Sequence, residues 1–263
     1  MALSSFSLTH VQYTQGDPLG FLCAGLSLAP VFLIVAYVTA ILARRDLYLF
    51  TGLVGQLFNT IFNVLIKKII KEPRPTTGHL THSPEAVGFS PHGMPSNHAQ
   101  FVFFFVGFWL PWIFTNANNQ RRGSAVNNGA GNRHHIGVVG GGGCVVWRHF
   151  AAVVIVLLAS AVVFARVYLH YHTLPQVGVG VAIGLVVGYV WHTLTIYWIR
   201  PVLFPLVTAS NIGALFGISD LSHVEDIVAW EHATATTTDT AAWGKLLEWR
   251  KEQEEGGHGK KKN

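Results

Sequence analysis

Three short clusters in this 263-residue sequence combine cations that can bind phosphate with histidines that can attack or protonate it. The first has the pattern K-x6-R-P, with Lys67 and Arg74 as its fixed positions. Lysine supplies a mobile point charge and arginine a planar fork of donors, a combination that suits a tetrahedral phosphate. Taken alone, this cluster could equally be a basic stretch at a membrane surface that contacts lipid headgroups.

The second cluster, P-S-N-H, directly precedes an apolar run, so Ser96, Asn97 and His98 should lie at the start of a helix. Proline suits the first helical turn and Ser or Asn suits the cap, so free backbone N–H groups would point at an anion in the loop. His98 would then be placed to donate a proton to a leaving oxygen. The alternative is a simple helix start with an incidental histidine.

The third cluster contains Arg166 and His172 in the pattern R-x5-H, and Gln176 follows four residues later. If a helix has begun there, Gln176 lies one turn from His172 and its side-chain oxygen can accept from one ring nitrogen. The other nitrogen would then be left as a nucleophile. We expect His170, two positions away, to point elsewhere. The alternative is an interfacial pair of histidines with an anchoring arginine, beside tyrosines of the membrane surface.

The composition is that of an integral membrane protein. Half of the residues (50%) are hydrophobic, only 12% are charged, and the mean hydropathy is +0.38. In a membrane protein, the net charge of +5 indicates orientation in the bilayer and contact with anionic lipid headgroups. No zinc-finger, RNP or helix-turn-helix signature indicates nucleic-acid binding. The pattern predicts an all-α, polytopic membrane bundle with about five transmembrane helices. The apolar runs are 19–43, 47–66, 99–114, 150–169 and 177–199.

Each of the three clusters adjoins the end of one of these runs. Because successive spans cross the membrane in alternating directions, all three clusters should lie on the same side of it. The positive-inside rule assigns the arginine-bearing loops at the opposite ends to the cytoplasm, so the clusters and the N-terminus should lie outside the cytoplasm, on the side that is lumenal in an organelle membrane. The cations at 67–74 break this rule, and a bound anion would explain the exception. We therefore expect one phosphate-sized active site at the lumenal membrane interface.

The chain divides into three expected parts. Residues 1–18 form a lumenal N-terminal segment, 19–200 a membrane domain, and 201–263 an interfacial segment followed by a cytoplasmic tail. The stretch 115–149 is rich in Asn and Gly and cannot bury a core, so we expect a flexible cytoplasmic insert there.

Two patterns inside the spans indicate how the helices pack. Asn59 and Asn63 are four residues apart on one helix face, and we expect them to point into the bundle toward its basic end. Gly180, Gly184 and Gly188 recur every four residues and should give the fifth span a smooth face for close packing.

In the order K-x6-R-P, P-S-x-H and R-x5-H, the clusters resemble the three motifs of the type-2 phosphatidic acid phosphatase superfamily. The stretches 67–75 (K-K-x2-K-E-P-R-P), 93–100 (G-M-P-S-x-H-A-Q) and 166–173 (R-V-Y-L-x-Y-H-T) are similar to its dolichyldiphosphatase branch. Two positions depart from the wider superfamily, which often has Ser and Asp where this chain has Ala165 and Gln176. Gln at the second position is similar to the dolichyldiphosphatase pattern.

The resemblance implies hydrolysis of dolichyl diphosphate to dolichyl phosphate and inorganic phosphate in the endoplasmic reticulum lumen, which recycles the glycosyl carrier lipid for protein N-glycosylation. His172 would be the nucleophile, giving a phosphohistidine, with Gln176 as its partner and His98 as the acid and base. The phosphate ligands would be Lys67, Arg74, Ser96, Asn97 and Arg166. No cofactor or metal is expected, because three cations supply the charge and the nearby acids are too few for a two-metal site.

Two other functions are compatible with the same residues. One is a broader lipid phosphate phosphatase that acts on phosphatidate, lysophosphatidate or sphingoid phosphates. The other is a non-catalytic lipid-phosphate-binding membrane protein that retains the anion site.

The last residues, K-K-K-N, resemble the dilysine retrieval signal of endoplasmic reticulum membrane proteins, with Lys260 and Lys261 at the required places. Such a signal is recognised by coat proteins on a cytoplasmic tail. We therefore expect a multi-pass protein of the endoplasmic reticulum membrane with a cytoplasmic C-terminus. The alternative is a solvated basic chain end.

Overall fold

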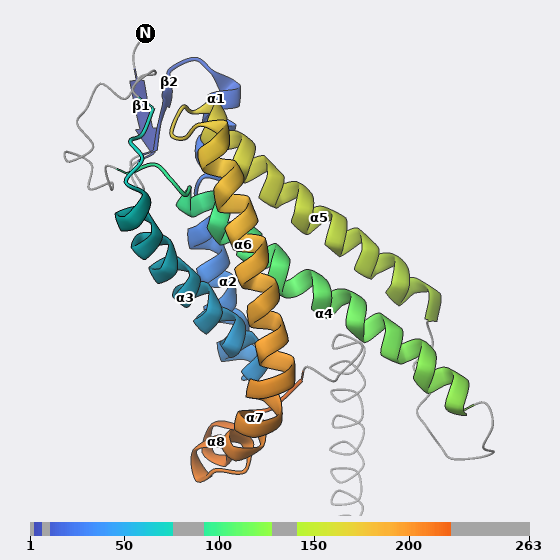
Figure 1. The fold of residues 1–263 in the computed structure, drawn as a ribbon. Helices are drawn as coiled ribbons and strands as arrows, with labels where there is room; N and C mark the ends of the chain where they lie inside the picture. The colour runs from blue at the N-terminus through green and yellow to red at the C-terminus, as the bar shows by residue number, and fades with distance from the viewer. Residues whose placement is uncertain (1–2, 7–10, 76–91, 128–140, 222–263) are drawn as a thin grey trace, which may run out of the picture.

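The computed structural model describes residues 3–6, 11–75, 92–127 and 141–221, and for 3–6, 115–127 and 141–145 it gives the backbone alone. A short antiparallel hairpin, which the sequence did not predict, precedes the helices (Figure 1). The elements in order are β1 (Leu3–Phe6), β2 (Val11–Thr14), α1 (Pro18–Leu26), α2 (Ala29–Arg44), α3 (Leu47–Ile70), α4 (Asn97–Asn127), α5 (Gly141–Tyr168), α6 (Leu174–Leu194), the π-helical η2 (Thr195–Ile199), α7 (Arg200–Thr208) and α8 (Asn211–Phe216).

The predicted membrane helical bundle is confirmed. Four helical stretches within the described residues are long and apolar enough to cross a membrane: Pro18–Arg44, Leu47–Ile70, Val146–Tyr168 and Leu174–Thr208. The remaining expected span, 99–114, lies in α4, which packs along α6 inside the bundle (Figure 1). A membrane crossing by α4 stays a prediction.

The first stretch differs from one continuous helix because it breaks between α1 and α2. Pro30 lies in the first turn of α2, where its missing N–H removes no helical hydrogen bond. The α3 helix is continuous for 24 residues, which gives about 36 Å, enough to cross a hydrocarbon core of about 30 Å. Asp46 caps its start, and Lys71 ends it in a left-handed conformation (φ 54°).

The predicted close packing of the fifth span is confirmed where α6 crosses α4. A Cβ added at Gly180 would lie 2.8 Å from the carbonyl oxygen of Ser96, and one at Gly184 would lie even closer to the carbonyl of Gln100. Only glycine lets the two backbones approach to this distance. The contact fixes the start of α4 against the start of α6.

The predicted inward orientation of the α3 asparagines is also confirmed. Both are 1% exposed, and they bracket Gln100 of α4. The Asn63 amide donates to Gln100 Oε1 at 2.7 Å, and the Gln100 amide donates to Asn59 Oδ1 at 2.8 Å. These amide bonds join α3 and α4 in the apolar interior, where an unpaired amide is costly.

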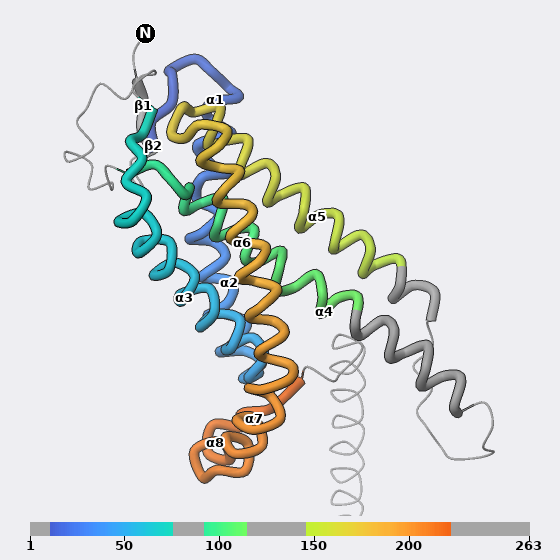
Figure 2. Tube along the Cα trace, viewed as in Figure 1, coloured from blue at the N-terminus to red at the C-terminus, as the bar shows by residue number. Residues whose placement is uncertain are grey.

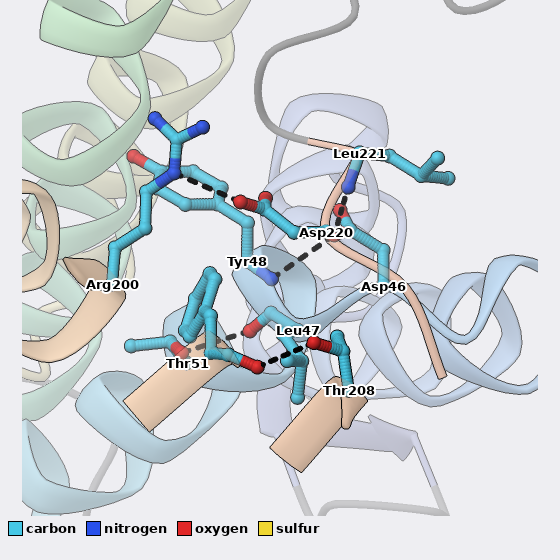
Figure 3. Close-up of polar contacts among 9 residues, drawn as sticks. Asp46, Leu47, Tyr48, Thr51, Arg200, Thr208, Asp220 and Leu221 are labelled. Carbon is cyan, nitrogen blue, oxygen red and sulfur yellow. Dashed lines mark hydrogen bonds and ion pairs between the residues drawn. The ribbon is translucent and has the colours of Figure 1, made fainter. Parts of the chain in front are cut away.

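At the opposite end of the bundle, the chain after α8 returns to the turn between α2 and α3 (Figure 3). Asp46 Oδ1 accepts the backbone N–H groups of Tyr48 and Leu221, each at 3.1 Å. Arg200 pairs with Asp220, with Nε 2.9 Å from Oδ2. The root of the C-terminal segment is therefore tied to the membrane domain.

Three expectations about the remaining segments stay predictions. The stretch 115–149 is helical at both ends, because α4 runs to Asn127 and α5 begins at Gly141, and its middle lies outside the described residues. The segment 201–218 forms α7 and α8, whose large apolar side chains are mostly exposed. Lys260 and Lys261 lie outside the described residues.

Candidate active site

One end of the bundle, the upper end in Figure 1, gathers the three predicted clusters. There α3 and α5 end, α4 and α6 begin, and the β1–β2 hairpin lies beside them (Figures 1 and 2). We call this the site end. The first cluster leaves α3, the second enters α4, and the third forms the turn from α5 into α6. Segments about 100 residues apart in sequence therefore meet at one place.

Lys67 lies in the last turns of α3 with only 6% of its surface exposed. It lies within electrostatic range of Arg74 and Arg166. Its sequence neighbour Lys68 is exposed, as expected for a headgroup contact, whereas Lys67 lies on the same buried helix face as Asn63. Burial of a lysine beside two arginines is the arrangement of an anion site and not of a surface anchor.

The loop after α3 pairs with the residues that precede the second cluster. The Gly93 N–H donates to the Glu72 carbonyl at 2.7 Å, and Pro73 forms a bridge with His92. A Cβ at Gly93 would lie 2.6 Å from both polar atoms of the Gln176 amide, so this position has no room for a side chain. Arg74, half-buried in the same loop, reaches across to the third cluster.

The second cluster begins α4 as predicted, but its backbone is used differently from the expectation. Ser96 is fully buried, and its N–H donates to the carbonyl of Gln176 at 3.0 Å, so this N–H is not free for an anion. The Ser96 hydroxyl, by contrast, has no hydrogen-bond partner among the described residues. The correction follows from the close α4–α6 crossing, which brings the Gln176 carbonyl onto the helix start. Asn97 is half-buried beside it.

His98 is held by α1. Its Nε2 lies 3.1 Å from the carbonyl oxygen of Ser27. A carbonyl can only accept, so Nε2 carries the proton and Nδ1 is left for proton exchange. His98 lies within electrostatic range of Arg166, Lys67 and Arg74.

His172 is positioned by a tight turn after α5. In this turn His170 has a left-handed conformation (φ 57°). The N–H groups of Tyr171 and His172 both donate to the Arg166 carbonyl, at 3.1 and 3.3 Å. His172 is 4% exposed, whereas His170 is exposed, as expected for the histidine without a role. His172 Nδ1 lies 3.2 Å from Gln176 Oε1.

The orientation of the Gln176 amide selects the reactive nitrogen of His172. Gln176 Nε2 donates to Glu72 Oε1 and to the carbonyl of Pro73, both at 2.9 Å, and neither oxygen could bond to an amide oxygen. Its Oε1 therefore faces His172 and the Thr173 N–H. Nδ1 of His172 carries the proton, and Nε2 keeps the lone pair of a nucleophile.

Arg166 is buried (2% exposed) and contacts α1 and its own turn. Nη1 donates to Ser27 Oγ at 3.1 Å, while Cζ lies 4.1 Å from the centre of the Tyr171 ring. The Nε atom is buried and has no hydrogen-bond partner in the part of the chain that the structure describes. Ser27 thus joins Arg166 and His98, one through its hydroxyl and the other through its carbonyl.

The electrostatics of the site are strongly positive. Within the described residues, neither Lys67 nor Arg166 has an ion-pair partner, and no group of three or more His, Cys, Asp or Glu side chains could hold a metal ion. Burial, followed by the charges of Arg166, Arg74 and Lys67, holds the pKa of His172 well below its usual range. The imidazole is therefore neutral at physiological pH and can act as a nucleophile without first losing a proton.

A separate pocket of about 500 Å³ lies beside the cations, between β2 and the end of α5. It shares Tyr171 with the site but contains Asp17, whose carboxylate accepts from the Tyr168 hydroxyl at 3.1 Å. None of the three clustered cations lines it. A carboxylate would repel a diphosphate, so the cation cluster, and not this pocket, is the candidate anion site.

Sequence reasoning missed three contributors to the site: Ser27, Glu72 and Tyr171. Ser27 is a polar residue inside an apolar run, which is itself a signal that the side chain faces the protein interior. Glu72 and Tyr171 lie inside the recognised motifs, but only the fold shows what each of them contacts.

Comparison with known proteins assigns this helical membrane bundle to a class of phosphatases. Residues 47–200 match the PAP2 superfamily, a stretch that contains all three clusters. The chain belongs to the PAP2 superfamily and is a phosphatase.

Its curated relatives include two proteins named dolichyldiphosphatase 1. The one from Dictyostelium discoideum is 32% identical over 88% of this chain and 89% of its own length. The one from Homo sapiens is 34% identical over 86% of this chain and 85% of its own. A protein named lipid phosphate phosphatase gamma, from Arabidopsis thaliana, is 30% identical over 89% of this chain and 91% of its own length. No solved structure matches this chain significantly.

Proposed function

We propose that this protein hydrolyses dolichyl diphosphate to dolichyl phosphate and inorganic phosphate in the endoplasmic reticulum lumen, and so recycles the glycosyl carrier lipid for protein N-glycosylation. Two kinds of observation support the proposal. The dolichyldiphosphatase relatives match over most of the chain, and the site end combines a cation cluster with a neutral histidine. The relatives support the assignment of the lipid substrate, and the residues of the site support the phosphate chemistry.

The observation that carries the phosphate chemistry is a set of buried polar groups without partners. Lys67 and Arg166 lack carboxylate partners in the described part of the chain, and Arg166 Nε and Ser96 Oγ lack hydrogen bonds. Unpaired buried charge is costly, and such groups are retained where a ligand satisfies them. A terminal phosphate brings both the negative charge and the acceptor oxygens that these groups need.

In the proposed reaction, the Nε2 lone pair of His172 attacks the terminal phosphorus. The bond from phosphorus to the bridging oxygen breaks, and its electron pair stays on the departing dolichyl phosphate. Once the anionic substrate is bound, His98 takes up a proton at Nδ1 and gives it to that oxygen, while Lys67, Arg74 and Arg166 stabilise charge on the equatorial oxygens. His98 then takes a proton from water, the water oxygen bonds to phosphorus, and the nitrogen–phosphorus bond breaks to release inorganic phosphate.

The cellular address belongs to the same proposal. The arginine-bearing ends of the spans would be cytoplasmic by the positive-inside rule, so the site end would face the lumen. The C-terminus would then be cytoplasmic, where coat proteins could bind Lys260 and Lys261 and return the protein to the endoplasmic reticulum.

The test is phosphate release from dolichyl diphosphate by purified protein in detergent with EDTA present. We expect the wild type to be active and His172→Ala to lose essentially all turnover, because the nucleophile is gone. His170→Ala is the matched control, since this exposed neighbour should tolerate the change. Equal activity of wild type and His172→Ala would reject the phosphohistidine mechanism, and folded wild type with no activity would favour a lipid-phosphate-binding protein.

A second candidate is a broader lipid phosphate phosphatase, which the match to lipid phosphate phosphatase gamma favours. The two are separated by kcat/KM on dolichyl diphosphate, phosphatidate, lysophosphatidate and a sphingoid phosphate under one condition. The proposal expects dolichyl diphosphate to be preferred by at least about tenfold, roughly 1.4 kcal/mol of transition-state binding. Comparable values on all four lipids would establish the broader activity.

A further inference from the structure

Tyr171 contacts both arginines of the site, although the reaction as written gives it no role. Its side chain is 2% exposed. Its backbone carbonyl accepts from Arg74 Nη1 at 3.4 Å, and its ring lies against the guanidinium of Arg166, 4.1 Å from Cζ. One residue therefore links the arginine of the first cluster to the arginine of the third.

The Tyr171 ring is itself held in place from several sides. Its hydroxyl accepts the backbone N–H of Gln12, in β2, at 2.8 Å, and its N–H donates to the Arg166 carbonyl at 3.1 Å. The ring packs with Val11 and Ala24 in a small buried cluster. The N-terminal hairpin and α1 therefore fix the surface against which Arg166 rests.

The support leaves one edge of Arg166 unused. Ser27 Oγ accepts one Nη1 hydrogen, and the Tyr171 ring covers a face of the guanidinium, whereas the buried Nε has no partner within residues 11–75, 92–127 and 141–221. A guanidinium binds an aromatic ring through its face and a phosphate through its edge, so the two contacts do not compete. The ring can therefore orient Arg166 without occupying its phosphate-binding donors.

We propose that Tyr171 is a positioning residue: its ring holds the Arg166 guanidinium with the Nε edge open to the terminal phosphate, and its hydroxyl anchors this support to the N-terminal hairpin. The inference rests on the proposed function, in which Arg166 binds phosphate. It adds that the hairpin, outside all three motifs, helps to build the anion site.

The first test separates the ring from the hydroxyl by measuring the inhibition constant of inorganic phosphate and kcat/KM. Tyr171→Leu removes the aromatic face, and we expect it to weaken phosphate inhibition and lower kcat/KM by about tenfold each. Tyr171→Phe keeps the face but removes the hydroxyl that anchors the ring to the hairpin, and we expect a smaller loss, of about threefold, in both. Tyr171→Met has a longer, more adaptable side chain of similar volume to leucine and no aromatic ring. It should behave as Tyr171→Leu and serves as the test if the leucine variant does not fold.

A double-mutant cycle with Arg166→Lys then tests whether the ring acts through Arg166. We expect Tyr171→Leu to weaken phosphate binding, measured by phosphate-dependent thermal stabilisation of the full chain, by less than about twofold when Arg166 is already lysine. Equal losses for Tyr171→Phe and the aliphatic variants, or additive losses in the cycle, would overturn the inference. If Arg166→Lys binds phosphate as tightly as the wild type does, the result would reject Arg166 as a phosphate ligand, which is part of the proposed function and not of the inference about Tyr171.

Discussion

His172 owes its proposed reactivity to groups from three separate segments. Gln176 fixes which nitrogen carries the proton, and Glu72 and Pro73 fix Gln176. Burial and the neighbouring cations hold the pKa of His172 below its usual range. A neutral imidazole beside cations is ready to attack an anionic substrate, whereas a protonated one would have no lone pair to offer.

This lowered pKa predicts the acidic limb of the pH profile. The imidazole is neutral above its lowered pKa, so kcat/KM, which reports the free enzyme, should lose activity only as the pH falls through a value below about 6.5. Arg74→Gln removes one of the charges that lower the pKa of His172, so the limb should move to higher pH. Substrate ionisation is common to both proteins and cancels in the comparison.

The control for this prediction is Arg45→Gln, which removes an exposed arginine at the far end of the bundle. It should leave the acidic limb unchanged. A limb that stays in place in Arg74→Gln, or that moves to lower pH, would contradict the electrostatic origin of the neutral imidazole.

At the residue scale, local spacing predicted some pairs and missed others. His172 and Gln176 are four residues apart at a helix start, so their contact follows from helical geometry. The contacts of Ser27 with His98 and Arg166 join residues about 70 and 140 positions apart, and no local rule could pair them. The backbone N–H of Ser96 was misassigned for the same reason, since its partner comes from a distant helix.

At the element scale, the crossing of α4 and α6 sets the distance between the second and third clusters. Gly184 is the test position, because an added Cβ there would meet the Gln100 carbonyl. We expect Gly184→Ala to destabilise the protein by about 1–3 kcal/mol and to lower kcat, since the helix starts must separate. Thermal unfolding in detergent and phosphate release measure the two effects.

Gly178→Ala in the same helix is the matched control, because nothing lies within 4 Å of its added Cβ. Alanine has the better helix propensity, so this variant should be neutral or more stable by roughly 0.5–1 kcal/mol. Equal stability of the two variants would show that the glycine face is not needed for packing. The four-residue glycine repeat predicted this face, whereas the break between α1 and α2 and the β1–β2 hairpin gave no comparable periodic signal.

At the scale of the whole molecule, the two ends have different tasks. At the site end, Lys67 and Arg166 are buried without an ion pair among the described residues, while the far end pairs Arg200 with Asp220 and caps α3 with Asp46 (Figure 3). The apolar runs predicted the bundle. The return of the chain to the turn after α2 could not be predicted, because it depends on a backbone N–H group, and such groups are present in every sequence. The positive-inside rule predicts the orientation, and the orientation would decide which leaflet delivers the substrate.

The proposed lumenal site can be tested by labelling in sealed endoplasmic reticulum vesicles. In a background with Cys23 and Cys144 replaced by serine, His170→Cys introduces a thiol at an exposed position of the site end, and Arg45→Cys introduces one at the far end. A membrane-impermeant maleimide should label Arg45→Cys in intact vesicles and His170→Cys only after the vesicles are opened with detergent. The reverse pattern would place the cation cluster in the cytoplasm, where arginine and lysine need no bound anion to explain them. The topological argument for the site would then be lost. The burial of Lys67 and Arg166 would remain as the argument for an anion site.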